Sequence, residues 1–200
     1  MAEQTQPFVK LVSTAVSDIA ALCELTEPAK ELVPRAQSPE AYLDSLTKAG
    51  LMSDAIRWLA QGLRPRESVW WACLAARAFV EWGNKLPEPD LAALTAAETW
   101  VFKPEEENRR AAMAKAQETG YQSPASWAAI AAFWSGGSMA PPDVPAVPPP
   151  QHLIGRAVWG AIMIASTSAV PPDQAEQRQR RLLSQGYDIA RGGNGRIAGA

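Results

Sequence analysis

The feature that most constrains this chain is residues 64–82, a predicted helix that is apolar on nearly every face. Pro65 suits a first helical position, and Glu67 adds an acidic residue to the first turn. At helical pitch, two opposite stripes are apolar: Val69, Cys73, Ala76 and Val80, and Trp71, Ala78 and Trp82. A helix that is apolar all round must be surrounded by other elements. We therefore expect it to be the central helix of an all-helical protein.

Prolines mark the predicted helix starts along the rest of the chain. They are Pro39, Pro65, Pro89, Pro104, Pro124 and Pro172. Proline favours the first turn of a helix, and no run of residues alternates as a strand would. The prediction is an all-α fold, an irregular bundle of about seven to eight short helices. Stacked antiparallel helix pairs are an alternative, but the unequal proline spacing argues against a true solenoid.

The chain reads as one domain between two flexible ends. We expect a flexible N-terminus over residues 1–10, a single helical domain over 11–191 and a flexible glycine-rich tail over 192–200. Residues 138–150 are rich in proline and favour extended polyproline geometry. This segment is a strap over the surface or a domain linker. We favour the strap, because the chain beyond it is too short to fold alone.

Composition narrows the classes of function. Nineteen Lys and Arg residues against 21 Asp and Glu give a formal net charge of −2, which argues against a nucleic-acid partner. Cys23 and Cys73 lie in apolar helical patterns and are expected to be buried and reduced, which fits a cytoplasmic location. No export signal is expected, because residues 1–7 are polar and lack the basic region that precedes the apolar stretch of a signal. Residues 153–170 are apolar but interrupted by Arg156, so a core helix is expected instead of a membrane span.

Residues for catalysis are few. His152 is the single histidine, and no nucleophile or metal partner stands near it in sequence. The turn Ser135–Ser138 could bind an anion, but it follows a helix, where carbonyls and not N–H donors are free. Glu105–Glu107 read as a solvated first helical turn. The sequence therefore predicts no catalytic residue, metal or cofactor. The alternative is a small hydrolase or toxin built on His152 and Ser135.

One charged stripe interrupts the apolar surface of the 64–82 helix. Arg66, Trp70, Arg77 and Glu81 follow one another at helical spacing. Tryptophan and arginine are typical anchors of protein interfaces, so these four residues are the predicted partner-binding site. The alternative is structural, with the arginines stacked on Trp70 and paired with neighbouring helices.

Several motifs together resemble an uncharacterised family of bacterial helical proteins. They are the runs DAIRWLA at 54–60, PRESVWWAC at 65–73, RRAA at 109–112 and FWSGGSMAPP at 133–142. The resemblance spans residues 38–192. It implies genes in type VI secretion clusters and an accessory role. The function expected is a non-enzymatic adaptor that binds a protein partner, either a secretion-system component or an effector. A purely structural subunit is a further alternative.

Overall fold

The computed structural model describes residues 6–197 and is all-α, as predicted. Within this range it contains ten α-helices and two short 3₁₀ helices, and no strand beyond an isolated bridge between Leu11 and Leu63. The helix count exceeds the predicted seven to eight because short helices precede residue 38. The elements are α1 Val16–Ala20, α2 Glu27–Leu32, η1 Val33–Arg35, α3 Pro39–Lys48, α4 Met52–Gly62, α5 Pro65–Glu81, α6 Glu88–Phe102, α7 Glu106–Gln117, α8 Pro124–Trp134, α9 His152–Thr167, η2 Pro172–Gln174 and α10 Ala175–Ala190.

The prolines begin most helices where the sequence predicted. Pro39, Pro65 and Pro124 are first helical residues, and Pro89 is the second residue of α6. Their missing N–H costs nothing at these positions, because the first-turn donors have no partner inside the helix.

Two of the predicted starts need correction. Pro104 lies just outside α7, whose N-cap is Glu105, and Pro172 opens the 3₁₀ turn η2 ahead of α10. Serine caps reinforce the starts of α3 and α8. Ser38 Oγ accepts a hydrogen bond from the Ala41 N–H at 3.2 Å, and Ser123 Oγ accepts one from the Ser126 N–H at 3.1 Å.

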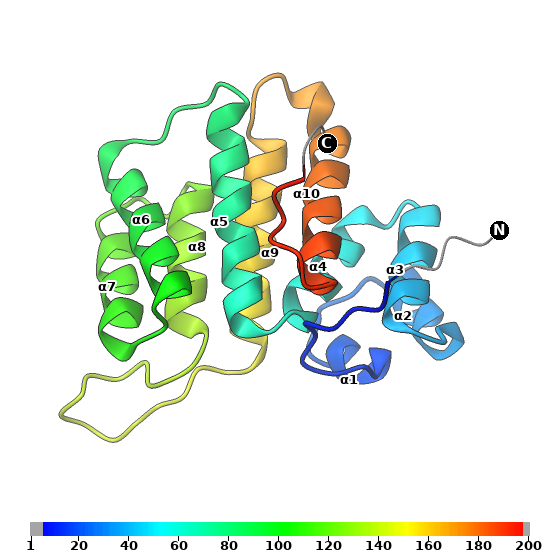
Figure 1. The fold of residues 1–200 in the computed structure, drawn as a ribbon, viewed down its shortest axis with the longest axis horizontal. Helices are drawn as coiled ribbons and strands as arrows, with labels where there is room; N and C mark the ends of the chain where they lie inside the picture. The colour runs from blue at the N-terminus through cyan, green and yellow to red at the C-terminus, as the bar shows by residue number, and fades with distance from the viewer. Residues whose placement is uncertain (1–5, 198–200) are drawn as a thin grey trace.

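Helix α5 occupies the middle of the molecule, as its sequence predicted. It packs against α6, α8, α9 and α10, and α9 in turn packs against α4 (Figure 1). The short helices α1, α2 and α3 gather beside α4 at the blue and cyan end of the chain. These neighbours cover the apolar residues on most, but not all, of the circumference of α5.

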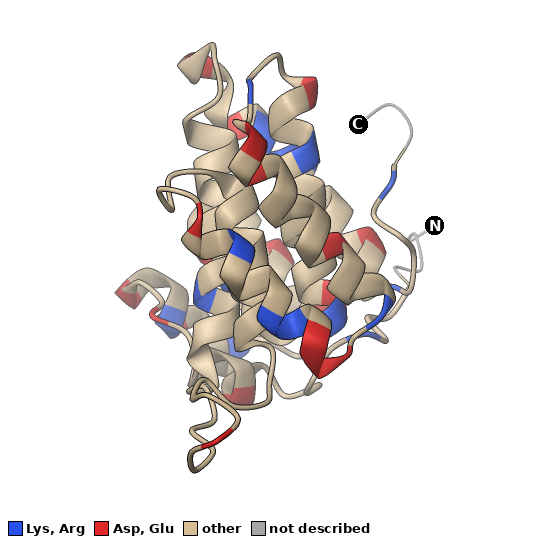
Figure 2. Ribbon diagram, turned by 90° about the vertical axis from the view of Figure 1, so that its left-hand side faces the viewer, with Lys and Arg blue, Asp and Glu red and all other residues tan. Residues whose placement is uncertain are grey.

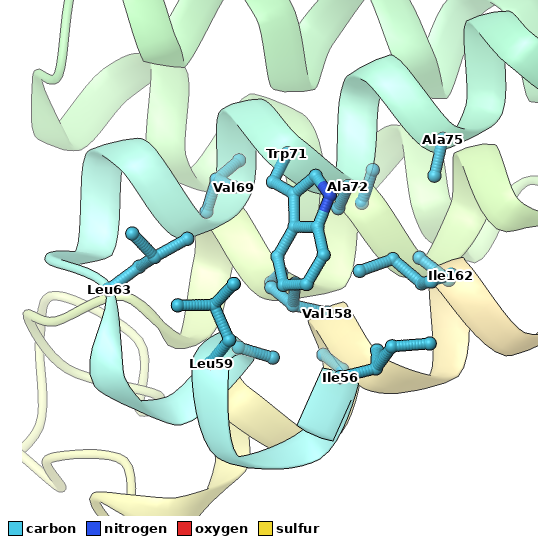
Figure 3. Close-up of a cluster of buried hydrophobic side chains, with 14 of the residues drawn as sticks. Ile56, Leu59, Leu63, Val69, Trp71, Ala72, Ala75, Val158 and Ile162 are labelled. Carbon is cyan, nitrogen blue, oxygen red and sulfur yellow. The ribbon is translucent and has the colours of Figure 1, made fainter. Parts of the chain in front are cut away.

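The core around α5 is centred on Trp71. Its indole is fully buried beside Leu59, Val158 and Ile162, and its Nε1–H donates to the Leu182 carbonyl at 2.8 Å (Figure 3). Gly186 of α10 makes room for the ring, since a Cβ there would lie 2.7 Å from Trp71 Cζ2.

The C-terminal end of α5 is less deeply buried than its middle. Val80, the last residue of one predicted apolar stripe, is 40% exposed, and Trp82, the last residue of the other, is only partly buried. The fully buried part of each stripe therefore ends about one helical turn before the prediction. The remaining residues of the two stripes are buried, namely Val69, Trp71, Cys73, Ala76 and Ala78. The tip still contacts α10, where Arg178 lies over the Trp82 ring and Arg181 pairs with Glu81.

The proline-rich segment connects α8 to α9 as a loop that projects from one end of the helices (Figure 1). Its residues 141–148 are exposed. Because α9 packs directly against α4, α5 and α8, the segment does not separate two domains. It also does not lie across a helical surface, as the predicted strap would.

Arg109 and Arg110 of α7 hold the base of this loop. Arg109, buried, donates to the carbonyls of Phe133 at 2.5 Å and Ser138 at 2.7 Å. Arg110 donates to the Ala140 carbonyl at 2.9 Å. Both arginines also bind Glu106, and these ion-paired hydrogen bonds hold the pKa of that carboxyl down to about 2.

The described parts of both terminal segments, residues 6–10 and 192–197, pack against the helical domain, whereas the sequence predicted flexible ends. Phe8 is buried, and the N–H groups of Val9 and Lys10 donate to the Ala190 carbonyl at 2.8 and 3.0 Å. At the other end, Gly195 is buried, and its N–H donates to Asp188 Oδ2 at 2.8 Å. The parts of these predictions at 1–5 and 198–200 lie outside the described residues.

The apolar run at 153–170 forms most of α9 and packs inside the protein. Ala157, Val158, Ala161 and Ile162 are fully buried. No helix between residues 6 and 197 combines the length and apolarity needed to cross a bilayer.

Candidate functional site

The four predicted site residues lie on the outward face of α5, in a groove between α6 and α10. We call this the Trp70 groove. It consists of two adjoining cavities of about 360 and 430 Å³, and Trp70 and Arg196 line both. The first cavity is lined by Arg66, Glu67, Trp70, Val101, Phe102, Ile189, Gly193, Asn194 and Arg196. The second is lined by Trp70, Leu74, Arg77, Ala78, Glu81, Glu98, Arg181, Gln185, Arg196 and Ile197.

Trp70 forms the middle of the groove floor and is only partly buried. Its Nε1–H donates to the Asn194 carbonyl at 2.8 Å, which fixes the orientation of the indole. The ring of Phe102 lies against it, with centroids 6.1 Å apart. Arg196 stacks over the indole, with Cζ 5.4 Å from the ring centroid. The sequence therefore identified a stacking tryptophan but not the arginine that stacks on it.

The charged residues of the stripe bind neighbouring elements and not one another. Arg77 forms a two-point ion pair with Glu98 of α6, at 2.8 and 2.6 Å, and this hydrogen bonding raises the pKa of the guanidinium. Glu81 pairs with Arg181 of α10 at 3.1 Å. These contacts match the structural alternative, in which the stripe pairs with adjacent helices.

Arg66 differs from Arg77. It is exposed, and its Nε–H donates to the Val101 carbonyl at 2.6 Å, near the end of α6. Among the described residues it has no carboxylate partner. Its neighbour Glu67 is paired with Lys10 at 3.1 Å, so that carboxylate is already neutralised.

The segment after α10 builds one wall of the groove, and the sequence reading missed this. Gly195 has a φ of +72°, which glycine adopts without strain, and a Cβ there would lie 2.6 Å from Leu74 Cδ1. This tight turn places Arg196 over Trp70. The Gly-Gly-Asn-Gly run at 192–195 is typical of a tight turn as well as of a flexible tail, so this pattern could have predicted the turn.

A separate cavity contains the single histidine. It has a volume of about 250 Å³, and its lining includes Cys23, Glu24, Arg57, His152 and Arg156. The hydrolase alternative requires Ser135 to lie beside His152. Ser135 does not line this cavity. Ser135 Oγ instead donates to the Ala132 carbonyl at 2.7 Å.

Cys23 lines the same cavity as His152 and is the residue there whose side chain could act as a nucleophile. It is only partly buried, so the prediction of two buried cysteines is correct for Cys73 alone, and both thiols are free. Burial nevertheless raises the pKa of Cys23 to about 12. A thiol with this pKa is protonated near neutral pH and is a poor nucleophile.

The other two sequence candidates have structural explanations. The turn at Ser135–Ser138 presents carbonyls, and the Arg109 side chain fills the space that an anion would need, with Nε 2.8 Å from the position of a Cβ on Gly137. Glu106 is occupied by two arginines. Among residues 6–197, no group of His, Cys, Asp and Glu is arranged to hold a metal ion.

Charges of both signs alternate over the side of the molecule that carries α6 and α7 (Figure 2). Lys and Arg do not form a continuous basic face in this view.

A family model for a family of unknown function, DUF6931, matches residues 42–190. The chain belongs to this family. The match covers most of the 38–192 range of the sequence resemblance and includes α4 to α10, and thus every helix of the groove. No curated protein and no solved structure matches the chain significantly.

Proposed function

We propose that this protein is a non-enzymatic accessory or adaptor protein that binds another protein through the Trp70 groove. The observation that carries the proposal is Phe102, which is 70% exposed beside the partly buried Trp70. Exposed aromatic side chains next to arginines are characteristic anchors of protein interfaces. A hydrophobic ring of this size gains free energy when a partner covers it.

The proposal also includes the secretion system in which the adaptor acts and the cellular compartment in which it is found. The motifs that resemble the secretion-associated family support a partner from a type VI secretion system, either a component or an effector. The free thiols of Cys23 and Cys73 support a reducing compartment, and hence a cytoplasmic location.

Co-expression with tagged products of neighbouring genes tests the proposal. Phe102→Ala should weaken co-purification of the partner at least tenfold, because truncating an interface anchor typically costs 2 kcal/mol or more, about thirtyfold in affinity. Leu91→Ala is the matched control, since Leu91 is an exposed side chain on the same helix, 42% exposed and outside the groove. Equal retention of the partner by both variants would place the interface elsewhere.

The same preparation separates the adaptor from the enzyme alternative. His152→Ala should leave both stability and partner binding nearly unchanged, since a single half-exposed residue usually contributes under about 1 kcal/mol. A hydrolytic activity that disappears in His152→Ala without unfolding would establish the enzyme reading.

A further inference from the structure

We propose that the Trp70 groove binds an extended peptide in which a large apolar side chain stands next to carboxylates. This inference rests on the proposed protein-binding function and specifies the chemistry of the bound segment. It combines three observations: the aromatic cavity, two arginines left without acidic partners, and a buried amide oxygen without a hydrogen bond.

The apolar part of the site is the first cavity. Trp70, Val101, Phe102 and Ile189 line it, and its volume of about 360 Å³ accommodates one aromatic or branched side chain. Trp70 is held rigidly by its bond to Asn194. A preformed aromatic surface binds without a further ordering cost, which favours a well-defined contact with one side chain.

The charge of the groove selects acidic neighbours for that side chain. Each of its three carboxylates already has a basic partner: Glu98 with Arg77, Glu81 with Arg181, and Glu67 with Lys10. Arg66 and Arg196 both line the first cavity, and neither forms an ion pair with a described residue. Over the residues that line the two cavities, four arginines stand against three carboxylates, and the two arginines without an acidic partner both line the cavity at Trp70. Arginine binds carboxylates with two parallel hydrogen bonds, so acidic residues are favoured there.

A polar group in the second cavity fits a peptide backbone. Gln185 is 8% exposed and lines this cavity, and its Oε1 has no hydrogen-bond partner among the described residues. A buried acceptor without a partner destabilises the folded protein, so a ligand that supplies a donor is favoured. Because this oxygen is itself buried, the Gln185 side chain must turn toward the cavity before a backbone N–H of the ligand can supply the missing donor.

The length of the groove favours an extended peptide over a small molecule. Arg66 and Glu81 mark its ends along α5, and fifteen residues of helix rise about 22 Å. An extended peptide covers this distance with about seven residues. The ligand class is thus a short acidic segment with at least one aromatic or large aliphatic residue, from a loop or terminus of the partner.

Selection from a displayed library of random octapeptides tests this specificity on the full chain. The wild-type protein is used for enrichment and the double variant Arg66→Ala/Arg196→Ala for subtraction. We expect enriched peptides to carry Phe, Trp, Leu or Ile next to Asp or Glu. The best peptide is then made with a fluorescein label and titrated by fluorescence anisotropy. Replacing its acidic residues with Asn and Gln, or its apolar residue with Ala, should weaken binding at least about tenfold.

The variants of the protein give a matched comparison. Arg66→Ala and Arg196→Glu should each weaken the selected peptide by about tenfold, and raising the salt concentration should weaken it further. Arg180→Ala removes one positive charge outside the groove, where Arg180 pairs with Glu176, and should leave binding unchanged. Arg66, Arg180 and Arg196 are all exposed, so thermal melts are expected to show folded variants.

Each contrary result is decisive. Enrichment of neutral or basic peptides that compete for the groove would overturn the acidic specificity but retain the proposed protein-binding function. Equal binding by wild type, Arg66→Ala and Arg196→Glu would also overturn it. If no peptide is enriched, the short-peptide inference is wrong, and co-purification of Phe102→Ala with the neighbouring gene products still decides the proposed function.

Discussion

Trp70 and Trp71 are adjacent in the sequence and lie on the same helix, yet their surroundings are opposite. Trp71 is fully buried, and its indole N–H binds a carbonyl of α10. Trp70 is partly exposed, and its indole N–H binds a carbonyl of the segment after α10. Successive helical residues point about 100° apart, so neighbours of one residue type can serve the core and the surface. The contrast separates stability from binding, and the following variants test it.

The largest expected effect is that of Trp71→Ala. Removing a fully buried indole deletes its packing and leaves a cavity, which typically costs about 3–5 kcal/mol of unfolding free energy. The Leu182 carbonyl also loses its donor. Urea denaturation followed by circular dichroism measures the loss. A loss below about 1 kcal/mol would contradict the placement of Trp71 in the core.

Gly186→Ala tests the same side of α5 by adding volume instead of removing it. The new Cβ would lie 2.7 Å from Trp71 Cζ2 and 2.8 Å from Leu59 Cδ2, so the indole or α10 must move. Overpacking of this kind costs about 1–3 kcal/mol, more than the gain in helix propensity from alanine. Chemical denaturation measures it. A stabilised variant would show that α10 packs less closely on Trp71.

Trp70→Ala should destabilise the protein less, by about 1–2 kcal/mol, because a partly exposed side chain loses only part of its burial energy. Its effect on the partner should be larger than its effect on folding, since the indole forms the floor of the groove. The two quantities come from thermal melts and from co-purification. Destabilisation as severe as that of Trp71→Ala would assign Trp70 to the core.

The smallest expected effect on stability is that of Arg77→Ala. The ion pair with Glu98 has two hydrogen bonds, but the Arg77 side chain is 48% exposed, and pairs near solvent contribute up to about 1 kcal/mol. A double-mutant cycle with Glu98→Ala isolates the interaction. If Arg77→Ala unfolds the protein as severely as Trp71→Ala, the charged stripe is an internal salt-bridge network, and binding must be sought elsewhere, including the projecting loop at Pro141–Pro150.

Sequence reasoning succeeded where the signals are local. The helix starts at Pro39, Pro65 and Pro124 follow from proline and serine chemistry within one turn. It was less accurate near the ends of the domain. Phe8 is buried by contacts with distant helices, and nothing in its immediate neighbours in the sequence requires this. Gly195 is buried against Asp188 of the preceding helix and Leu74 of α5, and only the second of these contacts is distant in sequence. Polar and glycine-rich ends were therefore predicted to be flexible.

The sequence determined the helical class, the central position of α5 and the four residues on its charged face, because the helical repeat fixes which residues share a face. Only the tertiary structure decided which partners these residues meet. Arg77 binds Glu98 and not Glu81, while Arg196 reaches Trp70 from the C-terminal segment. Spacing along one helix predicts contacts within that helix. Contacts between helices depend on how they cross and on turns such as the one at Gly195, so the groove exists only once the helices have packed.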